Sequence, residues 1–551
     1  MKGTLSFDRR KTEILLCILF FLSSFAIAFS YCERKQGMNE DETVTFGLAN
    51  SHNATWIYNV KDGFNGSDMT DNILYKDEIR SYLTADEGQL FDLRSAYTNQ
   101  INDVHPPLYY MIINIASSLN PGVFSKWNGL IPNLIIWSLQ LLLIYLLGRK
   151  TYDDRIISGL AMLLFGLSTG SLSNLLFIRM YILLGLMAIL LCYVIVCMMK
   201  KESLFSYLAV TLAIFLGFFT HYNYAFFAFL TCLVFGVYLL FTDYKKAIKF
   251  GISAFLGVGL FLLSFPYIFQ QMSVGAVGGS VSASSSMKKL FDVVSWVSSV
   301  NKGLQSIIKD MLPAMIIMAI CAVLIVVFRF IYGSQKENEN KNIKKEDWIN
   351  VLLIGLGTLL TICMVSILNP LVTGRYFYFL LPVISYIIGY IMYLATAYIK
   401  RFSFMERKVS EYTLYVMLFI AVFGLSYGKL RERDPKYIFE EYGAYRTIAR
   451  EYGNRPTVYL SSDEYKGVHD ETLQFWFDTD DVFITCKDLL HSSKLERYLQ
   501  DHAHNEELVL YIDTSFADVR EQLAYFEKEM GYQDKEELFY VPRTFVVLLS
   551  R

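Results

Sequence analysis

Long apolar runs separated by short polar connections fill most of the chain, and this pattern predicts membrane helices. A helix of about 20 apolar residues spans about 30 Å, the thickness of the hydrocarbon core of a bilayer. We therefore expect an α-helical polytopic membrane protein with about 11–13 transmembrane helices. The runs lie at residues 14–31, 106–119, 127–148, 155–172, 176–199, 204–220, 223–241, 250–270, 311–331, 349–368, 375–399 and 411–428.

Two stretches lack this pattern. Residues 32–105 are polar, and acidic side chains outnumber basic ones there. After about residue 430, strand-like and helix-like stretches alternate, which favours a small α/β domain with a mostly parallel sheet. The strand candidates are Thr457–Ser461, Val482–Thr485, Leu508–Ile512 and Thr544–Leu549, and the helix candidates are Tyr437–Tyr452, Leu489–Leu499 and Phe516–Met530.

These patterns divide the chain into four parts. We predict a transmembrane helix at 1–31, a large acidic external loop at 32–105, a multi-span domain at 106–430 and an external α/β domain at 431–551. The first part has an alternative. Basic residues precede its apolar run, and Ala26-Ile27-Ala28 resembles a signal-peptidase site, so a cleaved signal peptide competes with an uncleaved helix.

Basic residues mark alternate connections and predict the orientation. The connections between them, around His221 and Asn369, have almost no lysine, so the positive-inside rule places the basic set in the cytoplasm. The acidic loop, the 271–310 loop and the C-terminal domain are then external. Such a chain needs an odd number of spans, so either the short run at 106–119 does not cross or a further span lies within 155–199. The basic groups are Lys200-Lys201, Lys245-Lys246-Lys249, Lys341-Lys344-Lys345 and Lys400-Arg401-Arg407-Lys408.

Composition supports a multi-pass protein of the cell membrane. Of the 551 residues, 54% are hydrophobic and only 19% are charged, against roughly 25% charged in an average soluble protein. This excludes a soluble enzyme, a disordered chain and a fibrous protein. The net charge of −2 gives no field that would attract nucleic acid.

Polar groups occur at three places where the membrane boundary is expected. The first is Asn39-Glu40-Asp41-Glu42, shortly after the first run. It is either a solvated flank or a carboxylate held at the external surface, where it could act as a general base or bind a cation.

The second place is Asn102-Asp103-Val104-His105-Pro106-Pro107, at the start of an apolar run. Proline suits the first helical turn, so Asp103 and His105 would lie beside the positive end of a helix, which favours a bound anion. Helix capping followed by interfacial tyrosines is the alternative.

The third place is a pair of arginines in or near apolar runs, Arg179 and Arg375. An arginine at the bilayer centre costs about 2.5–3.5 kcal/mol on insertion scales, so it is a functional candidate, whereas snorkelling to the interface is the alternative. Two cations near the outer leaflet would suit a lipid-linked phosphate. His221 is a further candidate at an external turn, and Ser273–Ser286 is either a linker or a lid over substrate.

These motifs resemble the GT-C superfamily of membrane glycosyltransferases, and within it family 39, which includes protein O-mannosyltransferases and the lipid A aminoarabinose transferase. The resemblance covers roughly residues 10–430. It is carried by the motifs Asp41-Glu42, His105-Pro106-Pro107-Leu108, Arg179-Met180-Tyr181, and Arg375-Tyr376 before Leu381-Pro382.

The resemblance implies transfer of a sugar from a polyprenyl-phosphate carrier to a hydroxyl acceptor on the non-cytoplasmic face, with inversion. It makes Asp41 and Glu42 the catalytic pair. The expected substrate-binding residues are Asp103, His105, Arg179, Tyr181, Arg375 and Tyr376.

A divalent cation held by Asp103 and His105 is the one candidate cofactor, and membrane lipid is the expected surrounding partner. The alternatives to this reaction are a multi-span transporter, for which no symmetric pair of interrupted runs is evident, and a polymerase or ligase of lipid-linked oligosaccharides.

Overall fold

A computed structural model of the chain describes all residues except 1, 62–63, 275–291, 333–344, 369–371, 401–410, 463, 503–504 and 516–518. The predicted lid or linker at Ser273–Ser286, Asn369 and most of the two basic loops after residues 340 and 400 lie largely outside the described residues. The fold divides into two compact units. The membrane unit holds residues 1–33, 104–109 and 133–436, and the α/β unit holds residues 34–103, 110–132 and 437–551.

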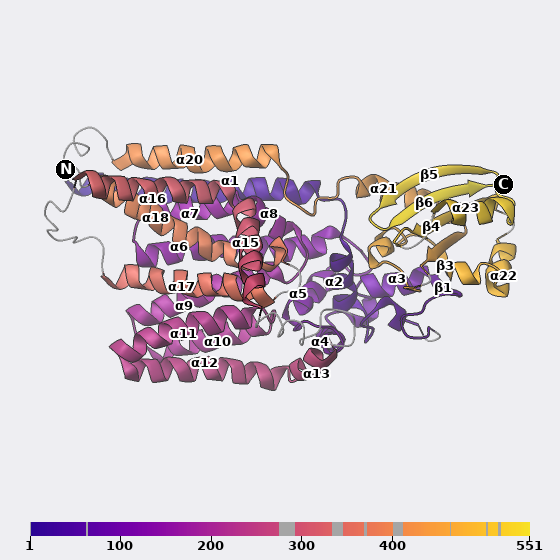
Figure 1. The fold of residues 1–551 in the computed structure, drawn as a ribbon, viewed down its shortest axis with the longest axis horizontal. Helices are drawn as coiled ribbons and strands as arrows, with labels where there is room; N and C mark the ends of the chain where they lie inside the picture. The colour runs from indigo at the N-terminus through magenta and orange to yellow at the C-terminus, as the bar shows by residue number, and fades with distance from the viewer. Residues whose placement is uncertain are drawn as a thin grey trace. The chain divides into compact units, whose positions relative to one another are not determined.

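The membrane unit consists of apolar helices, most of which run alongside one another (Figure 1). Its helices are α1 (Lys2–Arg34), α6 (Lys126–Thr151), α7 (Arg155–Gly166), α8 (Thr169–Leu176), α9 (Tyr181–Lys200), α10 (Leu204–Phe218), α11 (Tyr224–Thr242), α12 (Tyr244–Ser264), α13 (Ile268–Val274), α15 (Val293–Asp310), α16 (Leu312–Tyr332), α17 (Lys345–Leu368), α18 (Leu381–Lys400) and α20 (Glu411–Glu432). Two short 3₁₀ turns, η3 (Gly374–Tyr376) and η4 (Tyr378–Leu380), precede α18.

Nine of the described helices are long and apolar enough to cross a membrane, and the pair α7 and α8, bent by 58°, makes a tenth candidate. The expected multi-pass membrane protein is therefore confirmed. The predicted run at 106–119 forms α5 (Leu108–Ser118), which has 11 residues. A helix of that length reaches only about 16 Å, too short for the hydrocarbon core.

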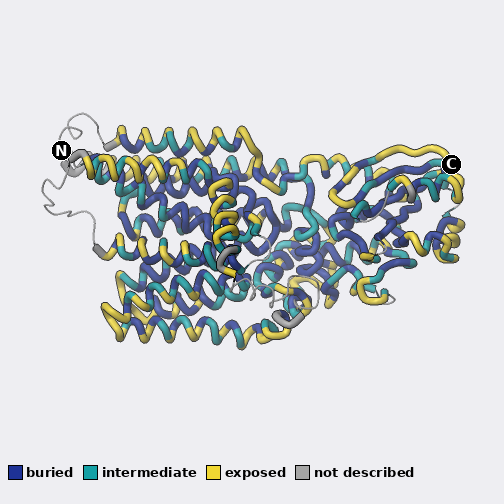
Figure 2. The backbone as a smooth tube through the Cα atoms, viewed as in Figure 1, coloured by how far each residue is buried: buried dark blue, intermediate teal, exposed yellow. Residues whose placement is uncertain are grey.

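Burial separates inner from outer helices in this unit (Figure 2). All residues of α7 after Arg155 are buried, and most of α9 is as well. In contrast, α1, α12, α16 and α20 keep broad apolar faces exposed. Because exposed apolar side chains of this density are not stable in water, these faces are the ones that lipid covers.

One helix runs across the others. Figure 1 shows α15 crossing the direction of the spanning helices. It contacts α8, α16, α17 and η3, and its apolar residues gather on one side of the helix. An amphipathic helix with this placement is suited to the membrane interface rather than to a span.

The α/β unit is built around one six-stranded sheet of order β1-β3-β2-β4-β6-β5. The strands are β1 (Asn72–Tyr75), β2 (Thr457–Ser461), β3 (Asp481–Cys486), β4 (Glu507–Asp513), β5 (Asp534–Val541) and β6 (Thr544–Ser550). The helices are α2 (Glu40–Asn50), α3 (Lys76–Leu83), α4 (Leu93–Ile101), most of α5, α21 (Tyr442–Glu451), α22 (Ser493–Asp501) and α23 (Val519–Lys528), with short turns η1 (Ile57–Asn59), η2 (Glu87–Gln89), η5 (Asp470–Gln474) and η6 (Lys487–Leu489).

The predicted α/β character is confirmed, but the sheet is mixed rather than mostly parallel. Only β3, β2 and β4 pair in parallel, with Val458 opposite Phe483 and Leu510. The edge strands are antiparallel. β1 comes from the acidic segment near the N-terminus, and its Leu74 is paired with Val482.

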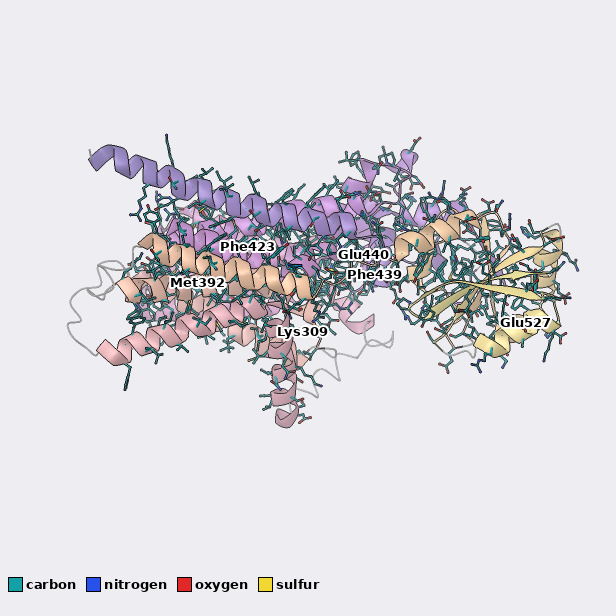
Figure 3. All side chains as sticks on the ribbon, turned by 90° about the horizontal axis from the view of Figure 1, so that it is seen from above. Lys309, Met392, Phe423, Phe439, Glu440 and Glu527 are labelled. Atoms are coloured by element: carbon teal, nitrogen blue, oxygen red, sulfur yellow. The ribbon has the colours of Figure 1, made fainter. Side chains whose placement is uncertain are left out.

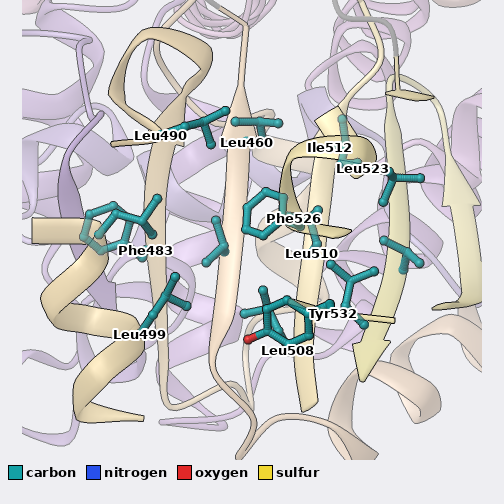
Figure 4. Packing of buried hydrophobic residues seen from close by; sticks show 14 of the residues in the cluster. Leu460, Phe483, Leu490, Leu499, Leu508, Leu510, Ile512, Leu523, Phe526 and Tyr532 are labelled. Carbon is teal, nitrogen blue, oxygen red and sulfur yellow. The ribbon is translucent and has the colours of Figure 1, made fainter. Parts of the chain in front are cut away.

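Each face of the sheet has its own core. On one face, leucines and other apolar side chains of β2, β4 and β6 pack with those of α22 and α23, among them the fully buried Phe526 (Figure 4). Leu495 of α22 belongs to the same core and is also fully buried. On the other face, the indole of Trp476 lies between Tyr459 of β2 and Tyr511 of β4, at centroid distances of 5.3 and 5.4 Å. The two connections that leave β2 and β4 therefore pass to opposite faces.

Candidate active site

Four aromatic rings meet in the membrane unit, and each comes from a different segment. The ring of His221 lies 5.4 Å from that of His105 and 5.4 Å from that of Tyr181. Tyr181 is also in edge contact with Tyr376 at 6.1 Å. The structure thus brings together three residues that the sequence singled out, and His221 joins them.

Backbone contacts hold this cluster together. The segment that carries His105 is tied to the end of α10 because the N–H of Leu108 donates to the carbonyl of Phe219 at 3.2 Å. The N–H of Asn223 donates to Nδ1 of His221 at 2.9 Å, which assigns the ring proton of the neutral imidazole to Nε2. Burial lowers the pKa of His221 well below its usual value, and the neighbouring His105 and Arg179 act in the same direction. His221 is therefore a neutral hydrogen-bond donor.

Arg179 lies in a break between two helices, which explains an arginine inside an apolar stretch. α8 ends at Leu176 and α9 begins at Tyr181, and Arg179 is buried in between. The end of α8 leaves carbonyls without helical partners, and Nδ2 of Asn133 donates to those of Leu175 and Phe177 at 2.9 and 3.2 Å.

The same asparagine is held by a tyrosine. The hydroxyl of Tyr109 donates to Oδ1 of Asn133 at 2.8 Å. The sequence analysis did not predict Asn133, although it is a polar residue within an apolar run and could have been chosen for that reason. Its role is to keep the α8–α9 break in shape, and with it Arg179.

Arg375 lies in the turn η3, and its guanidinium is 5.4 Å from the centroid of the Tyr376 ring. Cations and an acid from other elements lie near this turn. A Cβ at Gly374 would come within 2.8 Å of a carboxylate oxygen of Asp310, the last residue of α15. Burial raises the pKa of Asp310, whereas the charges of Lys436, Arg433 and Lys309 oppose that rise. Figure 3 labels Lys309 at this end of α15. No local pattern predicts this group, because its members are scattered along the chain.

The ring cluster and the basic residues occupy opposite ends of the helices. Tyr181 and Lys200 are the two ends of α9, which at 20 residues is about 30 Å long. Nζ of Lys200 lies 2.6 Å from Asp347 and also contacts the carbonyl of Lys150, and Nζ of Lys246 donates to the carbonyl of Met199 at 3.1 Å. The basic ends therefore gather away from Arg179 and Tyr181.

The predicted catalytic pair lies in the first turn of α2, in the α/β unit. Asn39 caps this helix by accepting from the N–H of Asp41 at 3.0 Å, and Oε2 of Glu42 accepts from the N–H of Asn39 at 2.8 Å. Glu42 is completely buried and forms an ion pair of 3.0 Å with Lys35, which is also completely buried. Lys35 lies 5.3 Å from the ring of Phe439, which Figure 3 labels. Both oxygens of Glu42 thus have protein partners, whereas Asp41 is half-buried.

Residues of the C-terminal part surround α2 within the same unit. α2 packs against η5, and Glu40 pairs with Arg543 from the turn between β5 and β6. Burial raises the pKa of the Asp470 carboxyl to about 7, with Glu40 and Asp41 adding to the rise and Arg543 opposing it. The hydroxyl of Tyr442 donates to Glu471 at 2.5 Å. Sequence reasoning missed these acids, since they resemble an ordinary solvated surface.

Asp103 and His105 belong to different units of the fold. Asp103 is buried in the α/β unit, and His105 belongs to the membrane unit. Within the described part of the chain, no group of three or more His, Cys, Asp or Glu side chains is arranged to hold a metal ion. The divalent cation stays a prediction.

Comparison with known proteins finds the same fold in solved structures, which agrees with the resemblance seen in the sequence. Two crystal structures of ArnT from Cupriavidus metallidurans share the fold, one bound to undecaprenyl phosphate and one in the apo state. The first matches with a TM-score of 0.52 and 12% identity, and the second with 0.53 and 11%, each over 96% of this chain and 97% of the other. No protein-family model and no curated protein matches the sequence.

Proposed function

We propose that this protein is a glycosyltransferase that moves a sugar from a polyprenyl-phosphate carrier to a hydroxyl acceptor on the non-cytoplasmic face of the membrane. The observation that carries the proposal is the group of Arg179, His221, His105, Tyr181 and Tyr376 at one end of the spanning helices. The fold shared with ArnT, which was crystallised with undecaprenyl phosphate, supports a lipid-linked phosphate as the donor.

The membrane unit supplies the groups that a donor phosphate needs. Arg179 and Arg375 are the cations that bind the donor phosphate, on which negative charge grows as its bond to the sugar breaks. The Nε2–H of the neutral His221 can donate to a phosphate or sugar oxygen without the cost of charging the ring. Tyr181 and Tyr376 offer ring faces and edges to the sugar. Because the basic helix ends lie at the other end of α9, positive-inside orientation puts this group at the outer face.

The reaction is a single displacement. The acceptor hydroxyl oxygen forms the new bond to the anomeric carbon, the bond from that carbon to the phosphate oxygen breaks, and the phosphate leaves with the bonding electrons. Asp41 accepts the hydroxyl proton. Inversion at the anomeric carbon follows from one displacement. Glu42 supports the geometry of α2 rather than the chemistry, because its two oxygens are engaged by Lys35 and Asn39.

The test is a transfer assay with purified protein and a panel of radiolabelled undecaprenyl-phosphate sugars. Asp41→Asn keeps the size of the side chain but cannot take the proton, so we expect turnover to fall by about 10²–10⁴-fold with donor binding retained. Arg179→Lys removes the bidentate fork, and a loss of about 10²–10³-fold is expected. Arg329→Met is the matched control, because Arg329 is an exposed residue in the last turn of α16.

Two results would contradict the proposal. If no polyprenyl-phosphate sugar is consumed by the wild-type protein, the reaction class is wrong. If Arg179→Met combined with Arg375→Met binds donor as well as the wild type does, the two arginines have structural roles and the donor site lies elsewhere.

A further inference from the structure

A polar cavity of about 50 Å³ lies within the α/β unit. Its walls come from α21, from the connection between η5 and β3, and from the segment before α6. A water molecule needs about 10–15 Å³ of such space, so the cavity has room for about three to five waters or for one tetrahedral oxyanion. The residues that line it include Phe124, Arg446, Arg450, Gln474, Phe477 and Asp478.

The cavity wall carries an arginine whose hydrogen-bonding capacity is only partly used. Arg446 is half-buried, and its Nη2 donates to the carbonyl of Gln36 at 2.6 Å. Its Nε is buried and has no hydrogen-bond partner among the described residues. Burial lowers the pKa of Arg446, and the charge of Arg450 lowers it further. A bound anion would supply the missing acceptor and offset the buried charge.

Asp478 is the acid that lines the cavity, and arginines engage both of its oxygens. Oδ1 accepts from Nη2 of Arg80 at 3.0 Å, and Oδ2 accepts from Nε of Arg450 at 2.9 Å. Arg80, which belongs to α3, is fixed further by Phe477. Its Nε donates to the Phe477 carbonyl at 3.2 Å, and its guanidinium lies 4.8 Å from the centroid of that ring. Arg446, Arg450 and Arg80 therefore gather around a single carboxylate, and the group carries a net of two positive charges.

Aromatic rings enclose these charges on one side of the cavity. The rings of Phe124 and Phe477 lie 5.6 Å apart. Apolar walls exclude water, so attraction between the arginines and an anion is stronger there than in open solvent. The side chain of Arg450, in contrast, is 75% exposed. The cavity therefore reaches the surface beside Arg450, and the remainder of a larger ligand can extend from there.

Charge and shape select the class of ligand. The planar fork of guanidinium donors matches the oxygens of phosphate and carboxylate groups. A phosphate monoester carries a charge of about −1.5 to −2 at pH 7, which balances two positive charges better than the single charge of a carboxylate does. A metal cation would be repelled by the arginines, and a neutral sugar would leave their charge unbalanced.

We propose that this cavity binds the phosphate group of a phosphate monoester, whose oxygens accept from Nε of Arg446 and from the guanidinium of Arg450. A soluble phosphate ester and a lipid headgroup that ends in phosphate present the same group, and the experiment distinguishes them. Arg179 and Arg375 belong to the membrane unit, whereas this cavity belongs to the α/β unit. Phosphate binding here does not rest on the proposed function.

The experiment is calorimetric titration of the full chain with glycerol 3-phosphate, in nanodiscs of phosphatidylcholine, with acetate as the carboxylate probe. We expect the Kd for glycerol 3-phosphate to rise about tenfold or more in Arg446→Met, because a hydrogen bond between charged groups is lost. The Kd should also rise in Arg450→Met. This second variant keeps the test decisive if Arg446→Met does not fold, since Arg450 is mostly exposed.

Nanodiscs of two further compositions identify the source of the phosphate. Phosphatidic acid ends in a phosphate monoester, and phosphatidylglycerol is the control because its phosphate is a diester of the same sign. If the apparent Kd for glycerol 3-phosphate rises only with phosphatidic acid, the site takes a lipid headgroup. If the Kd is the same in both, the site takes a soluble ester. Either result supports the proposal.

Two control variants make the test specific. Arg497→Met is the matched control, because Arg497 is exposed in α22 and does not line the cavity. Arg179→Met combined with Arg375→Met removes the proposed donor site and should still bind glycerol 3-phosphate. The proposal is overturned if the wild type does not bind this ester, if acetate binds as tightly, or if both cavity variants behave like Arg497→Met. Loss of all binding in the Arg179 and Arg375 double variant would also overturn it, because the phosphate would then bind in the membrane unit.

Discussion

At the scale of single residues, the ion pair of Lys35 and Glu42 is the most demanding feature of the α/β unit. Both side chains are fully buried, and Nζ of Lys35 also donates to the carbonyl of Tyr437 at 2.7 Å. Removing two charges from water costs several kcal/mol per ion, which their attraction offsets only while both are present. The sequence does not reveal this pair, because a lysine seven positions before a glutamate is unremarkable in a polar segment.

Breaking this pair should destabilise the protein strongly. Glu42→Gln leaves Lys35 charged and buried, and Lys35→Met does the same to Glu42, so each should lower the stability of the α/β unit by about 3–5 kcal/mol. The double variant should recover much of the loss, because no buried charge remains. Thermal unfolding of the purified chain, followed by limited proteolysis of the α/β unit, measures the stability lost in the single variants and the stability recovered in the double variant. Equal stability of Glu42→Gln and the wild type would show that the pair is solvated.

Asp470 makes the stability of the protein depend on pH. The folded state holds its pKa at about 7, above the usual value near 4. The folded state therefore binds the proton more tightly than the unfolded state does, and the contribution of Asp470 to stability falls as the pH rises from about 4 to about 7. Asp470→Asn should be more stable than the wild type above pH 7, by about 1–3 kcal/mol, and equally stable near pH 4. The test is the melting temperature of the wild type and of Asp470→Asn, measured across this pH range. If the two curves of melting temperature against pH run in parallel, Asp470 is not the group responsible.

At the scale of elements, close packing of α10 against α12 depends on a glycine. A Cβ at Gly257 of α12 would lie 2.7 Å from the carbonyl oxygen of Thr211 and 2.8 Å from Cβ of Ile214, both in α10. The hydroxyl of Thr211 also donates to the carbonyl of Ser253 in α12 at 2.9 Å. Small residues and interhelical hydrogen bonds of this kind hold helices together in lipid, where hydrophobic burial contributes little.

Substituting this glycine should separate the two helices. Gly257→Leu should cost at least about 1–3 kcal/mol, since the clash includes backbone that cannot rotate away. Gly259→Leu is the control on the same helix, because an added Cβ there meets nothing within 4 Å. Thermal stability and size-exclusion behaviour in detergent distinguish the two variants. A loss of similar size in both would mean that helix propensity, rather than packing, is responsible.

The elements differ in how far sequence patterns could predict them. β2 begins and ends at the predicted residues, and β3, β4 and β6 lie within one residue of prediction, because each is a short apolar run bounded by polar turns. β5 was missed because its first four residues are exposed. β1 was missed because four residues within an acidic segment carry little periodicity. The break at Phe177–Met180 was missed because hydropathy does not record where a helix bends.

At the scale of the whole molecule, the orientation is the prediction with the widest consequences. The basic helix ends contact one another within the membrane unit, and positive-inside logic puts that end in the cytoplasm. Alkaline phosphatase fused after residue 551 should therefore be active, and a fluorescent protein that folds only in the cytoplasm should be dark at that site. A fusion at Lys201 is the internal control and should give the opposite pair of signals. If the fluorescent protein is bright and the phosphatase inactive after residue 551, with the opposite pair of signals at Lys201, the orientation is the reverse of the prediction.

The candidate site was predictable in part. Arg179, Tyr181, His105 and Tyr376 could be chosen because polar residues beside apolar runs are conspicuous and because the motifs resemble a known superfamily. His221 was a weaker candidate, yet it makes ring contacts with both His105 and Tyr181. Asp470 and Arg543 could not be found this way. They reach α2 only through the folding of distant parts of the chain, and no local pattern encodes that contact.

The discontinuity of the α/β unit has a consequence for how the protein is made. Its sheet joins β1, at residues 72–75, to strands that are translated much later, after residue 456. About 300 residues of membrane helices are synthesised in between, which at roughly 5–20 residues per second takes some 15–60 s. In the predicted orientation, β1 and α2 cross the membrane during that time without their partners. The acidic segment therefore remains without its sheet partners until the strands after residue 456 have been translated. A nonsense mutation late in the gene would consequently unfold a region encoded near its beginning.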